Sequence, residues 1–150
     1  MKLSTRGRYG LKAMVDLAVA YGGGSVVTVG KLAELQGISV PYLEQLIAAM
    51  RKGGLVNSTR GAQGGYTLAR PPEDISVGEV LRVLEGSTAL VDCVGYESFD
   101  CENACSCSAR PLFLKLQSKI NAVLDTTTMK DMADDYIMQK RRMNDETGIS

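Results

Sequence analysis

The sequence predicts a mainly α-helical protein with one small β-wing, and two observations carry this fold class. Apolar residues recur at helical spacing along most of the chain, and glycines or capping residues bound each run. One short segment instead holds two strand-like stretches around a glycine-rich loop. Together these patterns predict a winged helix-turn-helix followed by a long dimerisation helix.

The first expected helix spans residues 5–21. Thr5 can cap its start, because a hydroxyl accepts a hydrogen bond from a free backbone N–H of the first turn. Three consecutive glycines at 22–24 end it. Its apolar residues at helical spacing are Leu11, Met14, Ala18 and Tyr21.

Two further helices are joined by a tight turn. One runs from about Val29 to Gln36 with Thr28 as its cap, and the turn Gly37-Ile38-Ser39 follows. Ser39 caps the next helix, whose first turn holds Pro41. Its buried face carries Leu43, Leu46, Ile47 and Met50, and glycines at 53 and 54 stop it. Two helices joined in this way form the skeleton of a helix-turn-helix.

A β-hairpin is expected directly after these helices. Residues 55–59 and 66–69 have the composition of strands, and the loop 60–65 between them contains one Arg and three Gly. A hairpin in this position is a wing, whose glycine-rich tip lets backbone and guanidinium approach a groove closely.

The second half of the chain is expected to hold three more helices. A capping box from Ser76 to Glu79 opens the first, which ends at Gly86. A long loop, 87–107, contains every cysteine and precedes a helix from about Ser108. The last helix begins near Thr128 and runs to about Met143. The middle helix is expected to form a dimer interface, because the rest of the chain offers little surface to cover its apolar residues. These residues are Phe113, Leu116, Ile120, Val123 and Leu124.

The predicted organisation is therefore a winged helix-turn-helix with a supporting helix at 1–86 and a cysteine-rich loop at 87–107. A dimerisation helix and a C-terminal helix follow at 108–143, and a polar tail occupies 144–150.

Charge and composition narrow the function classes. Residues 1–70 contain nine Lys and Arg against three Asp and Glu, whereas residues 71–150 contain eight against fourteen. A basic first half indicates a polyanionic partner. The chain has no histidine, so the commonest general base is missing, and no phosphate-binding loop is present; we therefore expect no enzyme. No apolar run suits a membrane span or a signal peptide, which predicts a cytoplasmic protein without a membrane partner.

Side chains at the start of a recognition helix contact base edges in the major groove. Gln can pair with adenine, Glu can accept from cytosine, and Ser can do either. The expected base-contacting residues are Ser39, Pro41, Tyr42, Glu44 and Gln45. Expected phosphate contacts are Lys2, Arg6, Arg8, Arg51 and Lys52, and the wing tip adds Arg60, Gly61 and Gln63. Alternatively, Tyr42 is a core aromatic, Glu44 stabilises the helix N-terminus, and the winged helix binds a protein.

Four cysteines fall within fifteen residues with the spacing C-x7-C-x3-C-x-C. In a reducing compartment, metal or redox chemistry is favoured over structural disulfides. The spacing lacks the C-x2-C pairs of a structural zinc site. An iron–sulfur cluster, zinc and thiol redox sensing all remain open from the residues Cys93, Cys101, Cys105 and Cys107 alone.

Several motifs in order resemble the Rrf2 family of bacterial transcription regulators over residues 1–126. They are Lys2-Leu3-Ser4-Thr5-Arg6-Gly7-Arg8-Tyr9, Ile38-Ser39, Tyr42-Leu43-Glu44-Gln45-Leu46, Gly54-Leu55-Val56, Arg60-Gly61, Gly64-Gly65-Tyr66 and Val77-Gly78-Glu79-Val80. Within that family, the cysteine loop is similar to that of the iron–sulfur cluster regulators. A member that regulates cysteine metabolism resembles the N-terminal half but lacks this loop.

The resemblance implies a homodimer bound to a palindrome-like double-stranded DNA operator and crossed by long helices. It implies a 2Fe-2S cluster, with 4Fe-4S less favoured, received from the iron–sulfur assembly machinery. Cys93, Cys101 and Cys107 match the three cysteine ligands. It also implies control of cluster biogenesis genes, including repression of the regulator's own operon in the cluster-loaded form.

One position departs from the family pattern. Iron–sulfur regulators of this type have a histidine three residues after the third cysteine, and here that residue is Arg110, which stays protonated and is a poor ligand. Cys105 is the candidate fourth ligand, with Glu97, Asp100 or Glu102 as alternatives to it. Otherwise Cys105 is a bystander thiol.

The position of the cysteines between the DNA-binding unit and the dimer helix predicts a switch. Ordering of the loop would set the separation of the two recognition helices and thereby the operator affinity. The alternative function is a nitric-oxide, thiol-redox or cysteine-metabolism regulator of the same fold.

Overall fold

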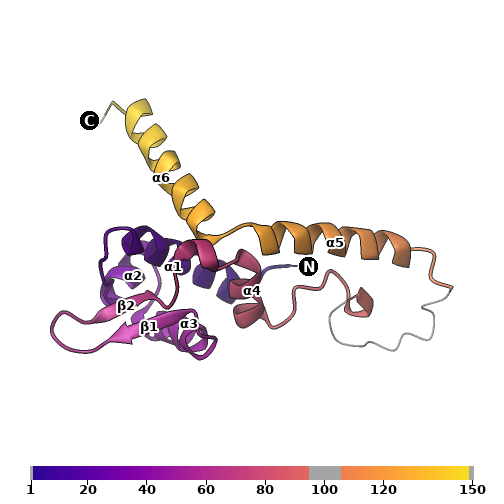
Figure 1. The fold of residues 1–150 in the computed structure, drawn as a ribbon, viewed down its shortest axis with the longest axis horizontal. Coiled ribbons are helices and arrows are strands. Elements are labelled where there is room, and N and C mark those ends of the chain that lie inside the picture. Colours follow the sequence, from indigo (N-terminus) through magenta and orange to yellow (C-terminus); the bar gives the residue numbers. More distant parts are fainter. Residues whose placement is uncertain (1, 95–105, 149–150) are drawn as a thin grey trace.

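The computed structural model describes residues 2–94 and 106–148. Figure 1 shows a winged-helix body from which a long helix extends sideways. The elements in chain order are α1 (Thr5–Tyr21), α2 (Val29–Gln36), α3 (Val40–Lys52), β1 (Val56–Thr59), β2 (Gly65–Leu68), the 3-10 turn η1 (Pro72–Asp74), α4 (Val77–Glu85), the 3-10 turn η2 (Asp92–Val94), α5 (Arg110–Thr126) and α6 (Met129–Glu146). The predicted fold class is confirmed.

Helix α1 is the centre of the body, because α2, α3, β2, α4 and α6 all pack on it. Its buried residues include Ala13, Met14 and Leu17, and they join apolar side chains from α3 and α4 in one continuous core. Gly10 lets α4 approach closely, since a Cβ at this position would lie 2.4 Å from Leu84 Cδ1. This packing fixes the helix-turn-helix on a rigid support.

The capping residues predicted for α2, α3 and α4 are confirmed. Thr28, Ser39 and Ser76 each accept a hydrogen bond from the backbone N–H three residues later. The prediction for α1 was wrong by one residue: the cap is Ser4, and Thr5 is the first helical residue. Ser4 is selected because its N–H and hydroxyl also donate to the carboxylate of Glu85, at 3.0 and 2.6 Å.

The wing is a two-stranded antiparallel hairpin with Val56 opposite Leu68 and Thr59 opposite Gly65. Both strands begin one residue away from the predicted start, since Leu55 precedes β1 and Gly65 belongs to β2. A single antiparallel bridge between Val27 and Tyr66 ties the wing to the segment before α2. The hairpin is thereby anchored beside the helix-turn-helix.

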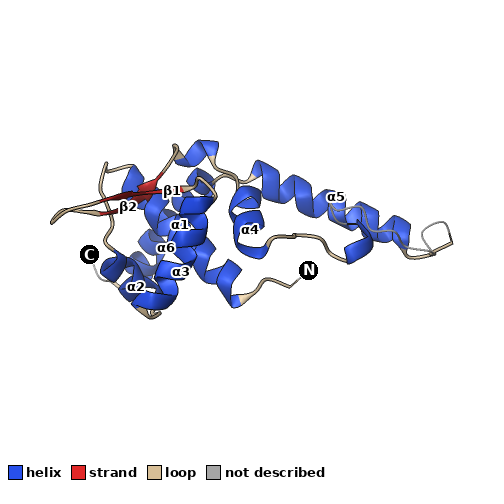
Figure 2. Ribbon diagram, turned by 90° about the horizontal axis from the view of Figure 1, so that it is seen from below, coloured by secondary structure: helices blue, strands red, loops and turns tan. Residues whose placement is uncertain are grey.

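Helices α5 and α6 complete the chain and leave the body in different directions (Figures 1 and 2). Helix α6 packs on α1 through Met129 and Ala133, and it extends to Glu146, three residues beyond the predicted end. Helix α5 contacts α4 and η2, and Gln117 is its one buried residue. No helix in the described ranges is both long enough and apolar enough to cross a lipid bilayer.

Candidate nucleic-acid interface and cysteine site

The start of α3 presents a polar, exposed surface. Ser39 is the N-cap, and Pro41 lies in the first turn without loss of a needed N–H. The side chains of Glu44 and Gln45 are exposed, because the buried face of α3 is formed by Leu43, Leu46, Ile47 and Met50. The predicted base-contacting residues Ser39, Glu44 and Gln45 therefore present a hydroxyl, a carboxylate and an amide to solvent, where they can enter a DNA groove.

Tyr42 is placed differently from its neighbours on α3. It is half-buried, and its ring packs edge-on against Tyr9 of α1, with centroids 6.4 Å apart and planes at 86°. Both rings lie against the apolar core. The structure thus favours the core interpretation for most of this side chain and also ties the first turns of α1 to the start of α3.

The end of α3 and the wing enclose a second polar surface. Arg51 and Arg60 line the same hollow of about 330 Å³, although they come from α3 and the wing loop. Three polar residues that were not predicted to contact DNA line it too: Thr28, Ser58 and Thr59. Sequence periodicity could not have found them, since the hollow forms only where the Val27–Tyr66 bridge brings the wing to α2.

The wing tip is tight and exposed. Arg60, Gly61 and Gln63 all face solvent. Gly61 has a φ of 109°, which favours glycine, and a Cβ on Gly64 would lie 2.2 Å from the carbonyl oxygen of Thr59. The tip therefore presents its backbone and the Arg60 side chain without bulky neighbours.

Exposed basic residues form two groups, one near the N-terminus and one at the end of α3. Lys2, Arg6 and Arg8 lie at the start of α1, and Arg51 and Lys52 occupy the last turn of α3. Figure 1 places the N-terminus and the wing at opposite ends of the winged-helix body, with α3 between them. This arrangement suits two runs of phosphates on either side of one groove.

The structure describes two of the four cysteines. Cys93 lies in η2 and Cys107 lies three residues before α5; both are free thiols and partly exposed. Cys101 and Cys105 lie outside the described residues, as do the alternative ligands Glu97, Asp100 and Glu102. Within 2–94 and 106–148, no three acidic, cysteine or histidine side chains gather into a metal site. The described thiols thus suit metal ligation chemically, and each borders the segment that holds the other two cysteines.

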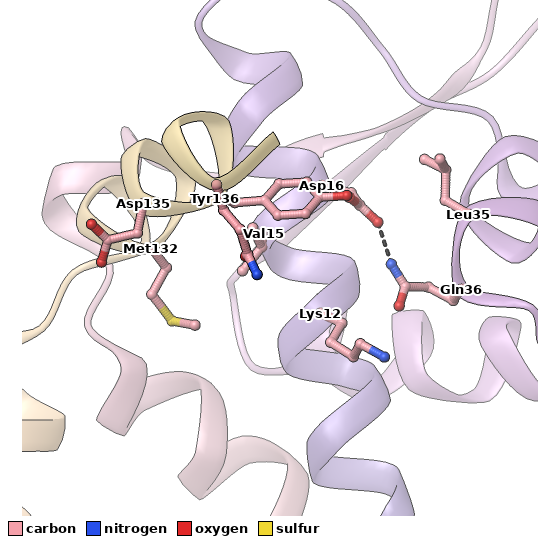
Figure 3. Close-up of a pocket in the computed structure, with 9 residues that line it drawn as sticks. Lys12, Val15, Asp16, Leu35, Gln36, Met132, Asp135 and Tyr136 are labelled. Atoms are coloured by element: carbon pink, nitrogen blue, oxygen red, sulfur yellow. Dashed lines mark hydrogen bonds between the residues drawn. The ribbon is translucent and has the colours of Figure 1, made fainter. Parts of the chain in front are cut away.

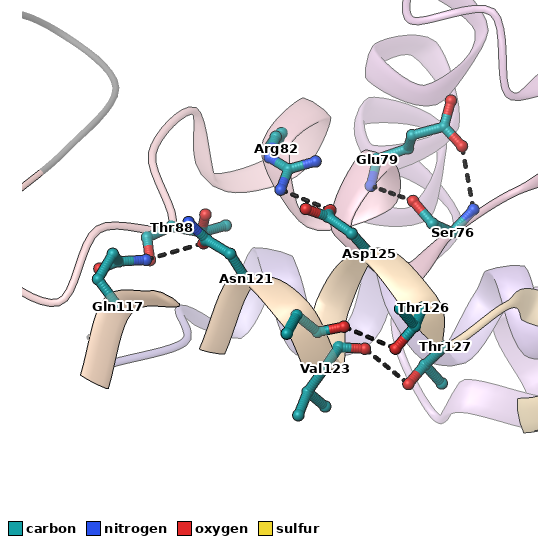
Figure 4. Close-up of polar contacts among 11 residues, drawn as sticks. Ser76, Glu79, Arg82, Thr88, Gln117, Asn121, Val123, Asp125, Thr126 and Thr127 are labelled. Carbon is teal, nitrogen blue, oxygen red and sulfur yellow. Dashed lines mark hydrogen bonds and ion pairs between the residues drawn. The ribbon is translucent and has the colours of Figure 1, made fainter. Parts of the chain in front are cut away.

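A buried glutamine joins the first part of the cysteine loop to α5. Gln117 is 5% exposed; its amide oxygen accepts from Leu90 N–H, and its amide nitrogen donates to the Thr88 carbonyl at 3.2 Å. It also donates to Asn121 Oδ1 at 2.9 Å (Figure 4). These bonds fix residues 88–90, directly before Cys93, to the long helix.

Arg110, where iron–sulfur regulators of the family have histidine, is the first residue of α5. It is half-buried, and its Nε is buried with no hydrogen-bond partner in the described ranges. A guanidinium stays protonated and is a poor iron ligand. The backbone N–H of Arg110 donates a hydrogen bond to the carbonyl oxygen of Cys107.

Residues 3–135 match the Rrf2 family, described as iron-dependent transcriptional regulators. The transcriptional regulator CymR of Bacillus subtilis is 39% identical over 133 residues, covering 89% of this chain and 90% of that protein. The transcriptional regulator IscR of Aliivibrio salmonicida is 38% identical over 140 residues, covering 93% and 82%. The similarity to CymR exceeds the N-terminal half to which the sequence analysis had limited it.

Solved structures give the same result. T. potens IscR superposes with a TM-score of 0.71 at 46% identity, covering 91% of this chain and 88% of that one. CymR, the global cysteine regulator of B. subtilis, superposes with a TM-score of 0.76 at 38% identity, covering 89% and 97%. These relatives are transcriptional regulators and not enzymes. The chain belongs to the Rrf2 family of dimeric, DNA-binding winged-helix transcriptional regulators.

Proposed function

We propose that this Rrf2 regulator senses iron–sulfur cluster status and controls cluster biogenesis genes by binding their operators as a homodimer. One observation supports the sensing role above the others. The free thiols of Cys93 and Cys107 border one loop, and this loop joins the DNA-binding body to α5. A cluster bound by this loop would therefore affect the DNA-binding body and α5 at the same time.

The proposed DNA contacts divide into two classes. Ser39, Glu44 and Gln45 contact base edges, with Pro41 and the exposed edge of Tyr42 beside them. Arg60 enters a minor groove from the wing, supported by Gly61 and Gln63. The remaining basic residues neutralise phosphates: Lys2, Arg6, Arg8, Arg51 and Lys52.

The proposed cluster ligands are Cys93, Cys101 and Cys107, with Cys105 as the fourth. A bound 2Fe-2S cluster supplies a redox-active and labile link among these thiolates. The four side chains provide the soft sulfur donors that such clusters require, and the iron–sulfur assembly machinery is the proposed donor. Arg110 would then offset part of the negative charge of the thiolates, because it begins α5 three residues after Cys107.

The path from the loop to DNA runs through packed elements. Residues 88–90 are bonded to Gln117 of α5, and α4, directly before the loop, packs on both α1 and α3. An ion pair of 2.6 Å between Arg82 and Asp125 joins α4 to the end of α5 (Figure 4). Ligation of the cysteines thus biases the position of α3 relative to the dimer helix.

A second candidate is regulation by thiol redox state, nitric oxide or cysteine metabolism. The identity to B. subtilis CymR, 39%, is similar to that to A. salmonicida IscR, 38%, although T. potens IscR is 46% identical. In this alternative, the same cysteines respond by oxidation or bind zinc, and the DNA-binding surface is unchanged.

The test is anaerobic binding of the protein to the promoter of its own gene, measured by fluorescence anisotropy in cluster-loaded and stripped forms. We expect loading to change affinity at least about tenfold, as allosteric couplings of this kind do, and both forms to weaken steeply as salt rises. A Cys93→Ser variant serves as the control, since it should keep the stripped affinity after reconstitution. Equal affinity of both wild-type forms on every promoter tested would refute the proposed switch, and salt-independent binding would refute the DNA-binding surface.

A further inference from the structure

A hollow of about 410 Å³ opens between α1, α2 and α6 of the body (Figure 3). Figure 1 shows that α5 extends away from these three helices. Its walls are apolar where Val15, Leu35 and Met132 meet the ring of Tyr136. Leu35 is 46% exposed, although α2 otherwise turns its leucine and alanine side chains inward. The volume lies in the range of small-molecule sites, which is about 300–1,000 Å³.

One half-buried carboxylate supplies the polar end of this hollow. Asp16 of α1 accepts a hydrogen bond from the side-chain amide of Gln36, the last residue of α2 (Figure 3). In the described ranges it forms no ion pair. Burial raises the pKa of Asp16, although the Gln36 hydrogen bond and the charges of Lys140 and Lys12 oppose the shift. A carboxylate withdrawn from water without a bonded cation is costly, and a cation that reached it would recover that cost.

The neighbouring lysines do not fill this role. Lys12 Nζ lies 5.2 Å from the centroid of the Tyr9 ring, and Lys140 Nζ lies 4.6 Å from that of Tyr136. Both ammonium groups are thus held over aromatic faces. Asp135 of α6 adds a second carboxylate to the lining, and Lys12 is the one basic residue among the described lining residues. Two carboxylates against one ammonium favour a cation over an anion.

We propose that this hollow binds a small primary amine with an apolar body. The ammonium group donates to Asp16, and the body lies against Val15, Leu35 and Met132. Helix α2 ends at Gln36, and the turn residue Gly37, with a φ of 65°, leads into α3. A ligand on Asp16 therefore sits beside the turn that sets the angle of the DNA-contacting helix, at a site separate from the cysteine loop.

The probe for this site is phenethylamine, with 2-phenylethanol as its neutral counterpart, titrated into the full-length protein. Methyl resonances of Val15, Leu35 and Met132 report occupancy in carbon–proton correlation spectra. We expect the amine to bind about tenfold more tightly than the alcohol, a difference of about 1.4 kcal/mol, because a hydrogen bond between two charged groups is stronger than one from a neutral hydroxyl. Asp16→Asn should reduce the amine to the affinity of the alcohol.

Two further variants separate binding from folding. Asp134→Asn also removes one carboxylate, but Asp134 lies on α6 outside the hollow, where it pairs with Lys130 at 2.9 Å; it should bind the amine like wild type. Leu35→Lys places an ammonium at the exposed edge of the hollow and should abolish amine binding without loss of a core residue. Absence of shifts in the wild type, equal binding of amine and alcohol, or wild-type amine affinity retained by either Asp16→Asn or Leu35→Lys would overturn the proposal.

Discussion

Glu44 is the residue of the DNA-contacting surface with the most distinctive chemistry. It is exposed on the second turn of α3, and no basic side chain in the described ranges forms an ion pair with it. A carboxylate facing phosphates is repelled unless it accepts a hydrogen bond from a base such as cytosine. We therefore expect Glu44 to carry sequence preference and to contribute little to general affinity.

Replacing Glu44 with alanine is expected to relax the operator sequence at one base position. The loss of discrimination should amount to about 1–3 kcal/mol, the value of one good base contact, with little change in nonspecific binding. Binding to a set of operators with single base changes measures it. Glu34→Ala, at an exposed acidic residue of α2 paired with Lys31, is the matched control. An unchanged preference in Glu44→Ala would show that Glu44 contacts no base.

A second residue-scale effect concerns Glu79, which closes the capping box of α4. Burial raises the pKa of this carboxyl, but hydrogen bonds from Ser76 and Arg70 together with the Arg70 charge outweigh it, so the pKa lies below its ordinary value of 4.5. The unfolded chain then binds the proton more readily than the folded one. The stabilisation is therefore present above pH 4.5 and is lost as the pH falls through the folded-state pKa.

Glu79→Gln is expected to lower the free energy of unfolding at pH 7 by up to about 1 kcal/mol, because the charge at the helix N-terminus and the Arg70 pair are both partly exposed. The difference from wild type should shrink as the pH falls below 4.5. Urea unfolding of both proteins at pH 7 and pH 3.5 measures this. A difference that is constant with pH would mean that the Glu79 charge contributes nothing.

At the scale of elements, the cysteine loop is joined to α5 through Gln117 and through the contact of η2 with α5. Gln117 satisfies the Leu90 N–H and the Thr88 carbonyl while it is itself buried, and Thr88 is also buried. Losing hydrogen bonds to such buried groups costs about 1–3 kcal/mol, so residues 88–90 would be held less firmly on α5 when Gln117 is replaced.

Gln117→Leu should therefore speed amide exchange of residues 88–90 and shorten the lifetime of a bound cluster. Hydrogen exchange measures the first effect in the cluster-free protein, and the decay of visible absorbance measures the second. Ser118→Ala, at the adjacent exposed position of α5, is the control and should change neither. Exchange rates equal to those of wild type would show that Gln117 does not hold the loop.

The elements that the sequence predicted well are the helices whose capping residue and terminating glycine both lie next to the helix in the sequence. Thr28, Ser39 and Ser76 cap helices that end at Gly37, Gly53 and Gly86, and cap and stop lie within each segment. The cap of α1 was misplaced because the choice between two adjacent hydroxyls depends on Glu85, 81 residues away in the chain. The hollow behind the wing and the Gln117 joint likewise depend on contacts between distant segments, which periodicity does not record.

The candidate DNA surface also contains features that the sequence predicts and features that depend on contacts between distant segments. The exposure of Glu44 and Gln45 followed from the apolar face of α3, which sequence spacing defines. The half-burial of Tyr42 could not be predicted from the spacing in α3, because it depends on contact with Tyr9 of α1. The proximity of Arg51 and Arg60 also required the folded wing.

At the scale of the whole molecule, α5 leaves apolar side chains exposed along one face. Leu112, Leu116 and Val123 are 56%, 41% and 63% exposed and lie on one face at a spacing of four and seven residues. The opposite side of the same helix packs on α4 of its own chain and contains Gln117. A second copy of the chain is the expected cover for the exposed face, since the family is dimeric.

Introducing negative charge on the exposed apolar face of α5 is expected to dissociate the dimer. Leu116→Glu combined with Val123→Glu is expected to give a monomer by sedimentation velocity at micromolar concentration and to weaken operator binding, because two half-sites must be held together. Ser118→Glu adds a charge away from the apolar stripe and should stay dimeric. A double variant that remains dimeric would place the interface elsewhere.

The most direct test of the account as a whole is the iron and acid-labile sulfide content of protein purified without oxygen, with its visible spectrum. We predict a brown protein with about two irons and two sulfides per chain, and loss of both in Cys105→Ala. A colourless wild type that cannot be reconstituted would contradict the iron–sulfur sensor. It would leave zinc or a thiol switch as the chemistry of the cysteine loop.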